Sequence, residues 1–345
     1  MANKNRNVNI ELVRVISIFF VILIHLSSPF FYNNELFHDK SFYWVINNIF
    51  YSFSRFSVPL FFIATAYIYF NSHADYKLSK RLVKVIVPYF IWSVVYFYFG
   101  DYAGGHTAID FISKTVFGNV STHLWFIPSF IGYIILLPLL KSYFIDSMDA
   151  DKKLIGLIIL FFVIIVPFCI MIVNQHVADA GFLWGIGQFN ISLPAFLCFP
   201  IGLYFVMKGE MPSKVISISI FIVLCLTIGL LNVQSSYSVN EIRETFFSYT
   251  SPLVYVSSFL AFFFIMKIDL SGVSCKIKQI IITLGSCSFG IYLSHILVRD
   301  VLQRYNLIYW GNPALSPVIN TIFIFLLSSL LVMIMKRIPV ISRAV

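Results

Sequence analysis

Charged side chains are scarce in this chain. They make up only 11% of its 345 residues, whereas a soluble domain carries about 25%. This deficit excludes an ordinary soluble protein. Hydrophobic residues contribute 59% of the chain, and they fall into long runs near the ~20 residues that are needed to cross a bilayer. The composition therefore indicates a multi-pass membrane protein.

Cysteine pairs and basic binding patches are missing as well. No two cysteines stand at metal-ligand spacing, so we expect neither a disulfide framework nor a metal site. The net charge of +9 would suggest nucleic acid in a soluble protein. Here no basic patch with stacking aromatics lies outside the apolar runs, so we expect no nucleic-acid partner. The five cysteines are Cys169, Cys198, Cys225, Cys275 and Cys287.

Ten apolar segments predict an all-α bundle of about ten transmembrane helices in the lipid bilayer. The second segment is overlong and contains Arg55 and Pro59, which predicts a kink or a partly interfacial stretch. The segments lie at residues 10–32, 43–70, 84–100, 123–144, 154–173, 190–207, 215–232, 248–266, 279–298 and 315–335.

The distribution of lysine and arginine predicts the orientation. With both termini in the cytoplasm, 18 of these residues fall on the inner side and 5 on the outer side, and Arg55 remains within the membrane. Cytoplasmic loops carry such an excess of basic residues. We therefore predict that both termini are cytoplasmic.

The first apolar segment carries Glu11, Arg14 and His25. A charge at membrane depth costs roughly 2.5–3.5 kcal/mol on insertion scales, so such a residue is a functional candidate by default. On an α-helix, Arg14 and His25 differ by only ~20° in azimuth and are ~16.5 Å apart along the axis. One helix face is therefore predicted to present an arginine at the cytoplasmic end and an imidazole in the outer half.

Other polar residues are predicted to lie near the same depth as His25. His123 and Trp125 begin the fourth segment at its outer end, Tyr292 and His295 lie near the outer end of the ninth, and Arg55 falls near mid-depth. We expect three histidines and an arginine to converge around one outward-facing cavity.

Each residue also has a structural explanation. A buried histidine such as His25 can simply bond a carbonyl, and Arg14 can be an anchor whose long side chain reaches the interface. His123 and His295 can be interfacial residues beside an aromatic belt. Arg55 is harder to explain in this way, because an arginine at mid-depth needs a partner or water.

Basic residues cluster at the start of the third segment. Lys80, Arg81 and Lys84 can be ordinary cytoplasmic charge. They can also form a clamp for an anionic ligand, because cations offer charge-assisted hydrogen bonds to phosphate.

Two broad function classes suit a ten-helix bundle with buried arginine and histidine. One is a membrane enzyme, and the other is a polysaccharide exporter or other secondary transporter. The chain lacks an obvious inverted repeat and matched glycine pairs in two halves, which argues against a transporter. A scaffold does not need buried charges.

Four stretches resemble the membrane-bound acyltransferase 3 family of bacterial O-acyltransferases. NIELVRVISIFFVILIH, SRFSVPLFFIATAYIYF, HLWFIPSFIGYIILLPLL and SFGIYLSHILV are similar, in order, to its first, second, fourth and penultimate helices. Two departures are present. Arg81 and Lys84 stand where the family often has paired arginines, and Thr65-Ala66 replaces its usual Ser-Gly step.

The resemblance implies a single transmembrane acyltransferase domain over residues 1–345, in a bacterial inner membrane. It implies transfer of an acyl group from a cytoplasmic acyl-coenzyme A, usually acetyl-CoA, to a sugar hydroxyl at the outer side. The acceptor would be a cell-surface glycan or a lipid-linked polysaccharide, such as O-antigen or exopolysaccharide.

The same resemblance and the predicted depths assign roles. His25 would deprotonate the acceptor hydroxyl or carry the acyl group transiently, and Arg55 or a backbone donor would stabilise the developing oxyanion. The donor phosphates would meet Arg14, Arg81 and Lys84, and the acceptor site would be shaped by His123, Trp125, Tyr292 and His295.

Overall fold

The computed structural model describes residues 6–72, 75–99, 107–116, 120–145, 149–176, 192–208, 212–249, 251–339 and 341–345. Within these ranges every regular element is a helix, which confirms the all-α fold class. The α-helices are α1 (Val8–Phe31), α2 (Asn34–His38), α3 (Phe42–Ser54), α4 (Ser57–Phe70), α5 (Leu78–Phe99), α6 (Ala108–Val116), α7 (Phe126–Leu140), α8 (Ala150–Leu160), α9 (Val166–His176), α11 (Ser192–Lys208), α12 (Lys214–Val239), α13 (Pro252–Met266), α14 (Cys275–Arg304) and α15 (Ser316–Met335). Short π or 3-10 segments are η1 (Lys141–Ile145), η2 (Phe161–Ile165), η3 (Thr245–Phe247) and η4 (Ile341–Ala344).

In the described ranges, eight helical segments are long and apolar enough to cross a membrane. Two shorter apolar helices, Phe196–Met207 and Pro252–Met266, coincide with the sixth and eighth predicted spans. Every predicted span overlaps a helix, although residues 100, 190–191 and 250 lie outside the described part. A multi-pass membrane protein is thus confirmed, while the exact number of crossings and the side of the termini stay predictions.

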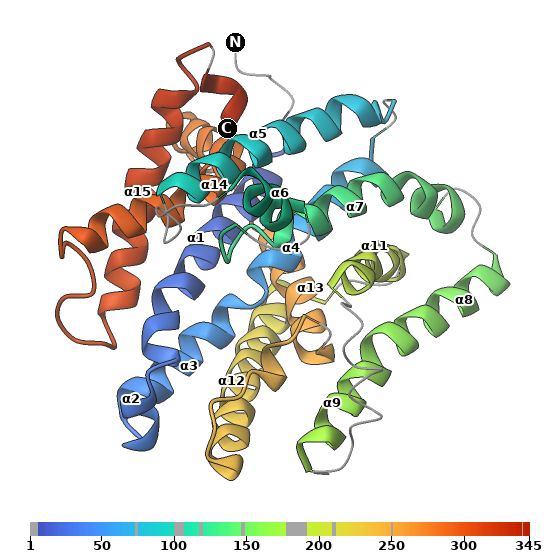
Figure 1. Ribbon diagram of the computed structural model, residues 1–345. Helices are drawn as coiled ribbons and strands as arrows, with labels where there is room; N and C mark the ends of the chain where they lie inside the picture. Colours follow the sequence, from blue (N-terminus) through green and yellow to red (C-terminus); the bar gives the residue numbers. More distant parts are fainter. Residues whose placement is uncertain are drawn as a thin grey trace.

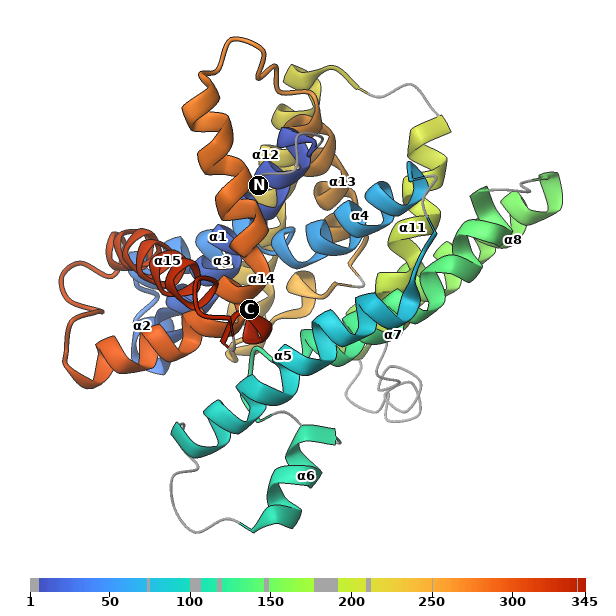
Figure 2. The ribbon, with the colours of Figure 1, turned by 90° about the horizontal axis from the view of Figure 1, so that it is seen from above.

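Helix α1 lies at the centre of the packing. It contacts α14 and α3 most extensively, and it also packs on α4, α15 and α13. Helices α8 and α9 lie at an edge of the molecule, far from α1 (Figures 1 and 2). In the segment Ala150–Ile172, only 11% of the most apolar window is buried by protein, so most of this surface is left for lipid.

Two asparagines secure the start of α1. The Asn7 side chain accepts hydrogen bonds from the backbone N–H groups of Asn9 and Ile10, and so caps the helix. The Asn9 amide donates to the carbonyls of Ile265 and Ile268, both at 2.9 Å, at the end of α13. The last carbonyls of a helix lack their usual i+4 partner, and Asn9 supplies a side-chain donor to the carbonyls at this end of α13.

The predicted kink in the second span is an interruption of two residues, Arg55 and Phe56, whose backbone stays in the αR region. Helix α3 ends at Ser54 and α4 begins at Ser57. Pro59 lies in the first turn of α4, where a missing N–H is tolerated, but it cannot continue a helix from α3. Arg55 therefore lies at the junction, and its side chain is directed toward η3 rather than along a helix face.

We expect Asn9→Ala to lower the free energy of unfolding by about 1–3 kcal/mol, because buried carbonyls at the end of α13 lose their donor. Thermal unfolding in detergent or nanodiscs measures the change. The control is Asn71→Ala, since the side-chain amide of the exposed Asn71 donates to the Tyr67 carbonyl of its own helix, at 2.8 Å. Equal melting temperatures for the two variants would contradict this account.

Candidate active site

Arg14 and His25 lie on one uninterrupted helix, as predicted. At the Arg14 end, the Glu11 carboxylate is buried and pairs with Arg14 at 3.3 Å and with Arg6 at 3.4 Å. Glu11 rests directly on Gly285 of α14, where an added Cβ would lie 2.4 Å from Oε2 of Glu11. The absence of a side chain at Gly285 therefore makes room for the carboxylate that holds Arg14.

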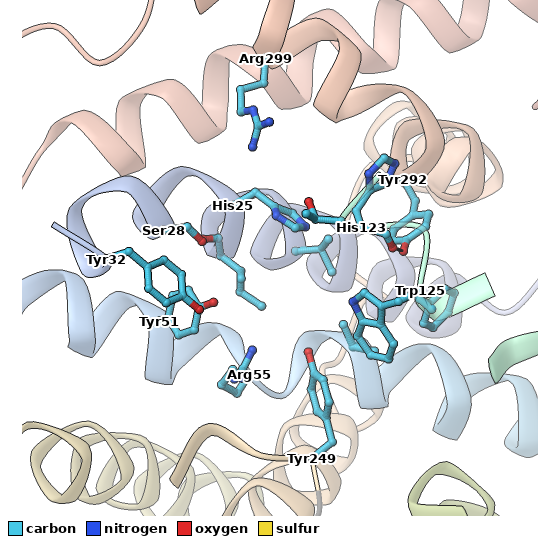
Figure 3. A pocket seen from close by; sticks show the side chains of 15 residues that line it. His25, Ser28, Tyr32, Tyr51, Arg55, His123, Trp125, Tyr249, Tyr292 and Arg299 are labelled. Atoms are coloured by element: carbon cyan, nitrogen blue, oxygen red, sulfur yellow. Dashed lines mark hydrogen bonds between the residues drawn. The ribbon is translucent and has the colours of Figure 1, made fainter. Parts of the chain in front are cut away.

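His25 lines a cavity of about 550 Å³, here called the His25 cavity (Figure 3). It lies among α1, α3, α14, the chain before α7 and the turn after η3. Its lining residues are Val21, Ile24, His25, Ser28, Tyr32, Tyr51, Arg55, Val58, Thr122, His123, Trp125, Phe126, Tyr249, Tyr292 and Arg299.

Three imidazole rings meet at one side of this cavity. The ring centroid of His295 lies 5.2 Å from that of His25 and 5.2 Å from that of His123. Nδ1 of His295 lies 2.7 Å from the Tyr292 carbonyl. A carbonyl only accepts hydrogen bonds, so Nδ1 carries the hydrogen and Nε2 carries the lone pair. His295 is thus held in one tautomer with its basic nitrogen free.

Two ring nitrogens of the imidazole cluster are left without a hydrogen-bond partner. Nε2 of His123 and Nε2 of His295 are buried and have no partner among the described residues. Nδ1 of His123 is 2.9 Å from the Ser121 hydroxyl. Leaving a buried polar atom unsatisfied costs about 1–3 kcal/mol, which structures tolerate chiefly where the group has a further role.

Arg55 has its partners in η3, the residues beside it and α3. Its Nε donates to the Phe247 carbonyl at 2.7 Å, and Nη2 pairs with Glu244 at 3.3 Å. The guanidinium carbon also lies 4.9 Å from the Tyr51 ring centre and 5.1 Å from that of Tyr249. Cation–π contacts of this kind stabilise a charge removed from water, so η3 and its flanks hold Arg55 at the cavity.

A second guanidinium enters the cavity from α14. Arg299 follows His295 by four residues, about one helical turn. Its Nη2 pairs with Asp300 at 2.6 Å. Figure 3 shows the side chain directed toward His25. The cavity therefore places two cations around one imidazole, each tied to a carboxylate.

Arg14 lines a separate cavity of about 210 Å³, here called the Arg14 cavity. Its walls come from α1, α4, α5, α7 and α14. The lining residues are Arg14, Phe61, Thr65, Val85, Phe126, Phe130, Gly285, Ser286, Ser288, Phe289 and Tyr292. One helix thus contributes a different titratable side chain to each of two cavities.

The predicted convergence holds for most residues. His25, Arg55, His123, Trp125 and Tyr292 line the His25 cavity. The remaining histidine, at 295, borders it through its ring contacts with His25 and His123.

Arg81 and Lys84 stand apart from both cavity linings. Arg81 donates from Nε to the Tyr76 carbonyl at 2.9 Å, and its guanidinium lies 4.5 Å from the centre of the Tyr76 ring. Lys84 is exposed, and only its neighbour Val85 reaches the Arg14 cavity. Their part in a phosphate clamp stays a prediction.

Several lining residues, and the partner of Arg55, escaped the sequence prediction. Arg299 could have been found one turn beyond His295, and Tyr51 one turn before Arg55, by helical periodicity. Glu244 and Tyr249 flank a short 3-10 turn, and no periodic signal in the sequence brings that turn to Arg55.

The fold and the site define a multi-pass membrane protein with a histidine-lined and an arginine-lined cavity along the same pair of helices. A family model described as an acyltransferase domain matches residues 7–337, nearly the whole chain. The chain therefore belongs to the acyltransferase 3 family and is a membrane acyltransferase. Comparisons with curated proteins and with solved structures gave no match.

In the described residues, no group of three or more histidine, cysteine, aspartate or glutamate side chains is arranged to hold a metal ion. All five cysteines are free in the structure.

Gly285→Ala should reduce acyl transfer by about 10- to 100-fold, because displacing the Glu11 carboxylate misplaces Arg14, and errors of about 1 Å have such effects. Gly272→Ala is the matched control, since an added Cβ there meets nothing within 4 Å. Activity is measured at equal amounts of folded protein. Full activity of the Gly285 variant would refute the positioning role of Glu11.

Proposed function

We propose that this protein is an O-acetyltransferase of a bacterial inner membrane. It transfers an acetyl group from cytoplasmic acetyl-CoA to a sugar hydroxyl of a surface or lipid-linked polysaccharide, such as O-antigen or exopolysaccharide. The membrane acyltransferase family supports the reaction type. Acetyl-CoA as donor and a sugar hydroxyl as acceptor are inferred from the chemistry of the two cavities. The bacterial inner membrane is inferred from the resemblance of the sequence to the family.

The observation that carries the proposal is the position of two side chains on α1. Arg14 lines one cavity and His25 lines another. A guanidinium offers charge-assisted hydrogen bonds to phosphate, and a neutral imidazole accepts a proton. A two-substrate transfer needs one group for each substrate, and a single helix supplies both in a fixed relation.

The proposed reaction is direct transfer. The sugar hydroxyl oxygen attacks the thioester carbonyl carbon while the lone pair of His25 takes the hydroxyl proton. The C–S bond of the resulting tetrahedral intermediate then breaks. The coenzyme A thiolate leaves and takes the proton from His25, so the imidazole returns to its neutral form.

His295 supports this role by its fixed tautomer. Its Nδ1–H is committed to the Tyr292 carbonyl, and its ring lies beside that of His25. A neutral neighbour does not repel the proton that His25 gains. An acyl-histidine intermediate is the variant of the same chemistry, and rapid quenching with labelled donor would trap label on His25.

Arg55 is the proposed electrostatic partner of the intermediate. Donors held in place before the reaction stabilise an oxyanion with little reorganisation. Glu244 and the Phe247 carbonyl fix the guanidinium of Arg55 at the cavity wall. Arg299 faces the same space from α14 (Figure 3).

The acceptor is proposed to bind in the His25 cavity. Trp125, Tyr51 and Tyr249 offer ring faces, and apolar faces of sugars pack on such rings while hydroxyls reach the polar groups. The volume of about 550 Å³ falls within the range of sites for small ligands.

The donor phosphates are assigned to the Arg14 side. Arg14 is half-exposed and oriented by Glu11, so it can pair with phosphate without leaving its carboxylate. We propose that Arg81 and Lys84 add longer-range attraction for the polyanionic donor from the surface near α5.

A polysaccharide exporter remains the alternative function. Inverted membrane vesicles supplied with labelled acetyl-CoA distinguish the two, because an acetyltransferase places label on the glycan in proportion to CoA released. Glycan movement without label transfer would favour the exporter.

His25→Ala should lower acyl transfer by about 10²–10⁴-fold, the usual contribution of a general base. His38→Ala is the matched control, since His38 is exposed on α2 and lines neither cavity. Label on the glycan is measured at equal membrane content of protein. Wild-type acylation by the His25 variant would remove the proposed base.

Arg55→Lys should lower kcat by about 10²–10³-fold with a small change in KM, because the shorter ammonium loses the fixed geometry needed for the oxyanion. The control is Arg243→Lys, since Arg243 pairs with Glu241 at 2.7 Å and lines neither cavity. A rise in KM with unchanged kcat would assign Arg55 to ground-state binding instead.

A further inference from the structure

Resting on the proposed function, we propose that Phe126 is a gate between the two cavities. In the closed position the Phe126 ring lies against the fixed ring of Tyr292. When the Phe126 ring rotates away, a passage opens between the cavities, and the width of this passage limits the length of the acyl group that can cross. The same closed pair keeps the thioester from water in the His25 cavity until an acceptor is in place.

The first observation is the shared wall. Phe126 and Tyr292 line both the His25 cavity and the Arg14 cavity, and no other described residue lines both. Their ring centroids are 5.2 Å apart. Only 5% of Phe126 and 4% of Tyr292 is exposed. Two apolar ring bodies therefore separate the space beside Arg14 from the space beside His25.

The second observation is that Tyr292 is anchored. Its hydroxyl donates to the His123 carbonyl, and its own carbonyl accepts from Nδ1 of His295 at 2.7 Å. Both bonds join it to the imidazole cluster. Tyr292 also lies within the long helix α14, and rotating its ring away would break the buried hydrogen bond from its hydroxyl to the His123 carbonyl.

Phe126 is held by apolar contacts alone. Its ring packs on Phe62 and Phe130, each with centroids 5.2 Å away. It is the first residue of α7 and follows the turn that carries His123. Rotation of a phenyl ring between staggered positions breaks no hydrogen bond. Of the two rings in the wall, Phe126 is the one that can move at low energy.

The wall lies where the reaction needs a passage. The proposed donor contact is at Arg14 and the proposed base is at His25, so the acyl carbonyl has to cross between the cavities. An open passage would also admit water. His25 could then deprotonate water, and attack on the thioester carbon would give free carboxylic acid and the coenzyme A thiol in place of the transferred group.

Selectivity for the length of the acyl group follows from the same geometry. An acetyl group needs little displacement of the Phe126 ring, whereas each further methylene needs more. Apolar pockets discriminate about 10- to 200-fold per methylene. Removing the ring should therefore weaken both the barrier to water and the discrimination against longer acyl groups.

The test is release of coenzyme A thiol from acetyl-CoA and butyryl-CoA by purified protein in nanodiscs, with no acceptor added. For Phe126→Ala we expect acceptor-independent release to rise about tenfold, and the butyryl-to-acetyl ratio to rise about tenfold, on the scale of one apolar methylene. Phe126→Leu keeps most of the apolar volume of the side chain and should give smaller changes in both quantities. This variant keeps the test valid if Phe126→Ala does not fold.

Phe196→Ala is the matched control. Phe196 stacks on Phe62 with centroids 4.0 Å apart, is fully buried, and lines neither cavity. It should alter neither the release nor the ratio. The double variant Phe126→Ala, His25→Ala should lose the extra release, because His25 is the base that activates water.

The gate is overturned if the folded Phe126 variants match wild type in both quantities, or if Phe196→Ala reproduces their effect. Acyl transfer by the wild-type protein in inverted vesicles distinguishes failure of the gate proposal from failure of the proposed function. Transfer with no effect of Phe126 variants refutes the gate alone. Absence of transfer refutes the proposed function, and the gate with it.

Discussion

The contact between α1 and α14 is the constraint on which the rest of the site depends. At one end, Glu11 rests on the bare backbone of Gly285 and holds Arg14. At the other end, His25 lies against His295. Because lipid cannot satisfy polar groups, these contacts also bury charge and imidazole that would otherwise oppose insertion. Both cavities are lined by residues of these two helices.

Arg55 illustrates how a charge at membrane depth is accommodated. The second span is interrupted at Arg55 and Phe56, just before Pro59, although both residues keep αR dihedrals. Glu244, the Phe247 carbonyl and aromatic rings then surround the guanidinium. The carboxylate neutralises the charge without drawing the side chain from the cavity wall.

Two cavities rather than one continuous channel suit the proposed reaction, in which the acyl donor and the sugar acceptor bind separately. The Arg14 cavity is small and bounded by phenylalanines, whereas the His25 cavity is larger and carries most of the titratable groups. Their only shared wall consists, among the described residues, of two aromatic rings. Separation by side chains, not by backbone, allows communication without a rearrangement of helices.

The sequence by itself determined the helical membrane class, the continuous first helix, and the convergence of His25, His123 and Tyr292, because apolar period and segment polarity are local properties. Only the tertiary structure decided the partner of Arg55, the contact of Glu11 with Gly285, and the shared wall at Phe126. These depend on chain segments that meet across 150 residues or more, such as Arg55 with Glu244, whose sequence separation is 189. No local pattern encodes such meetings, since they follow from how whole helices pack.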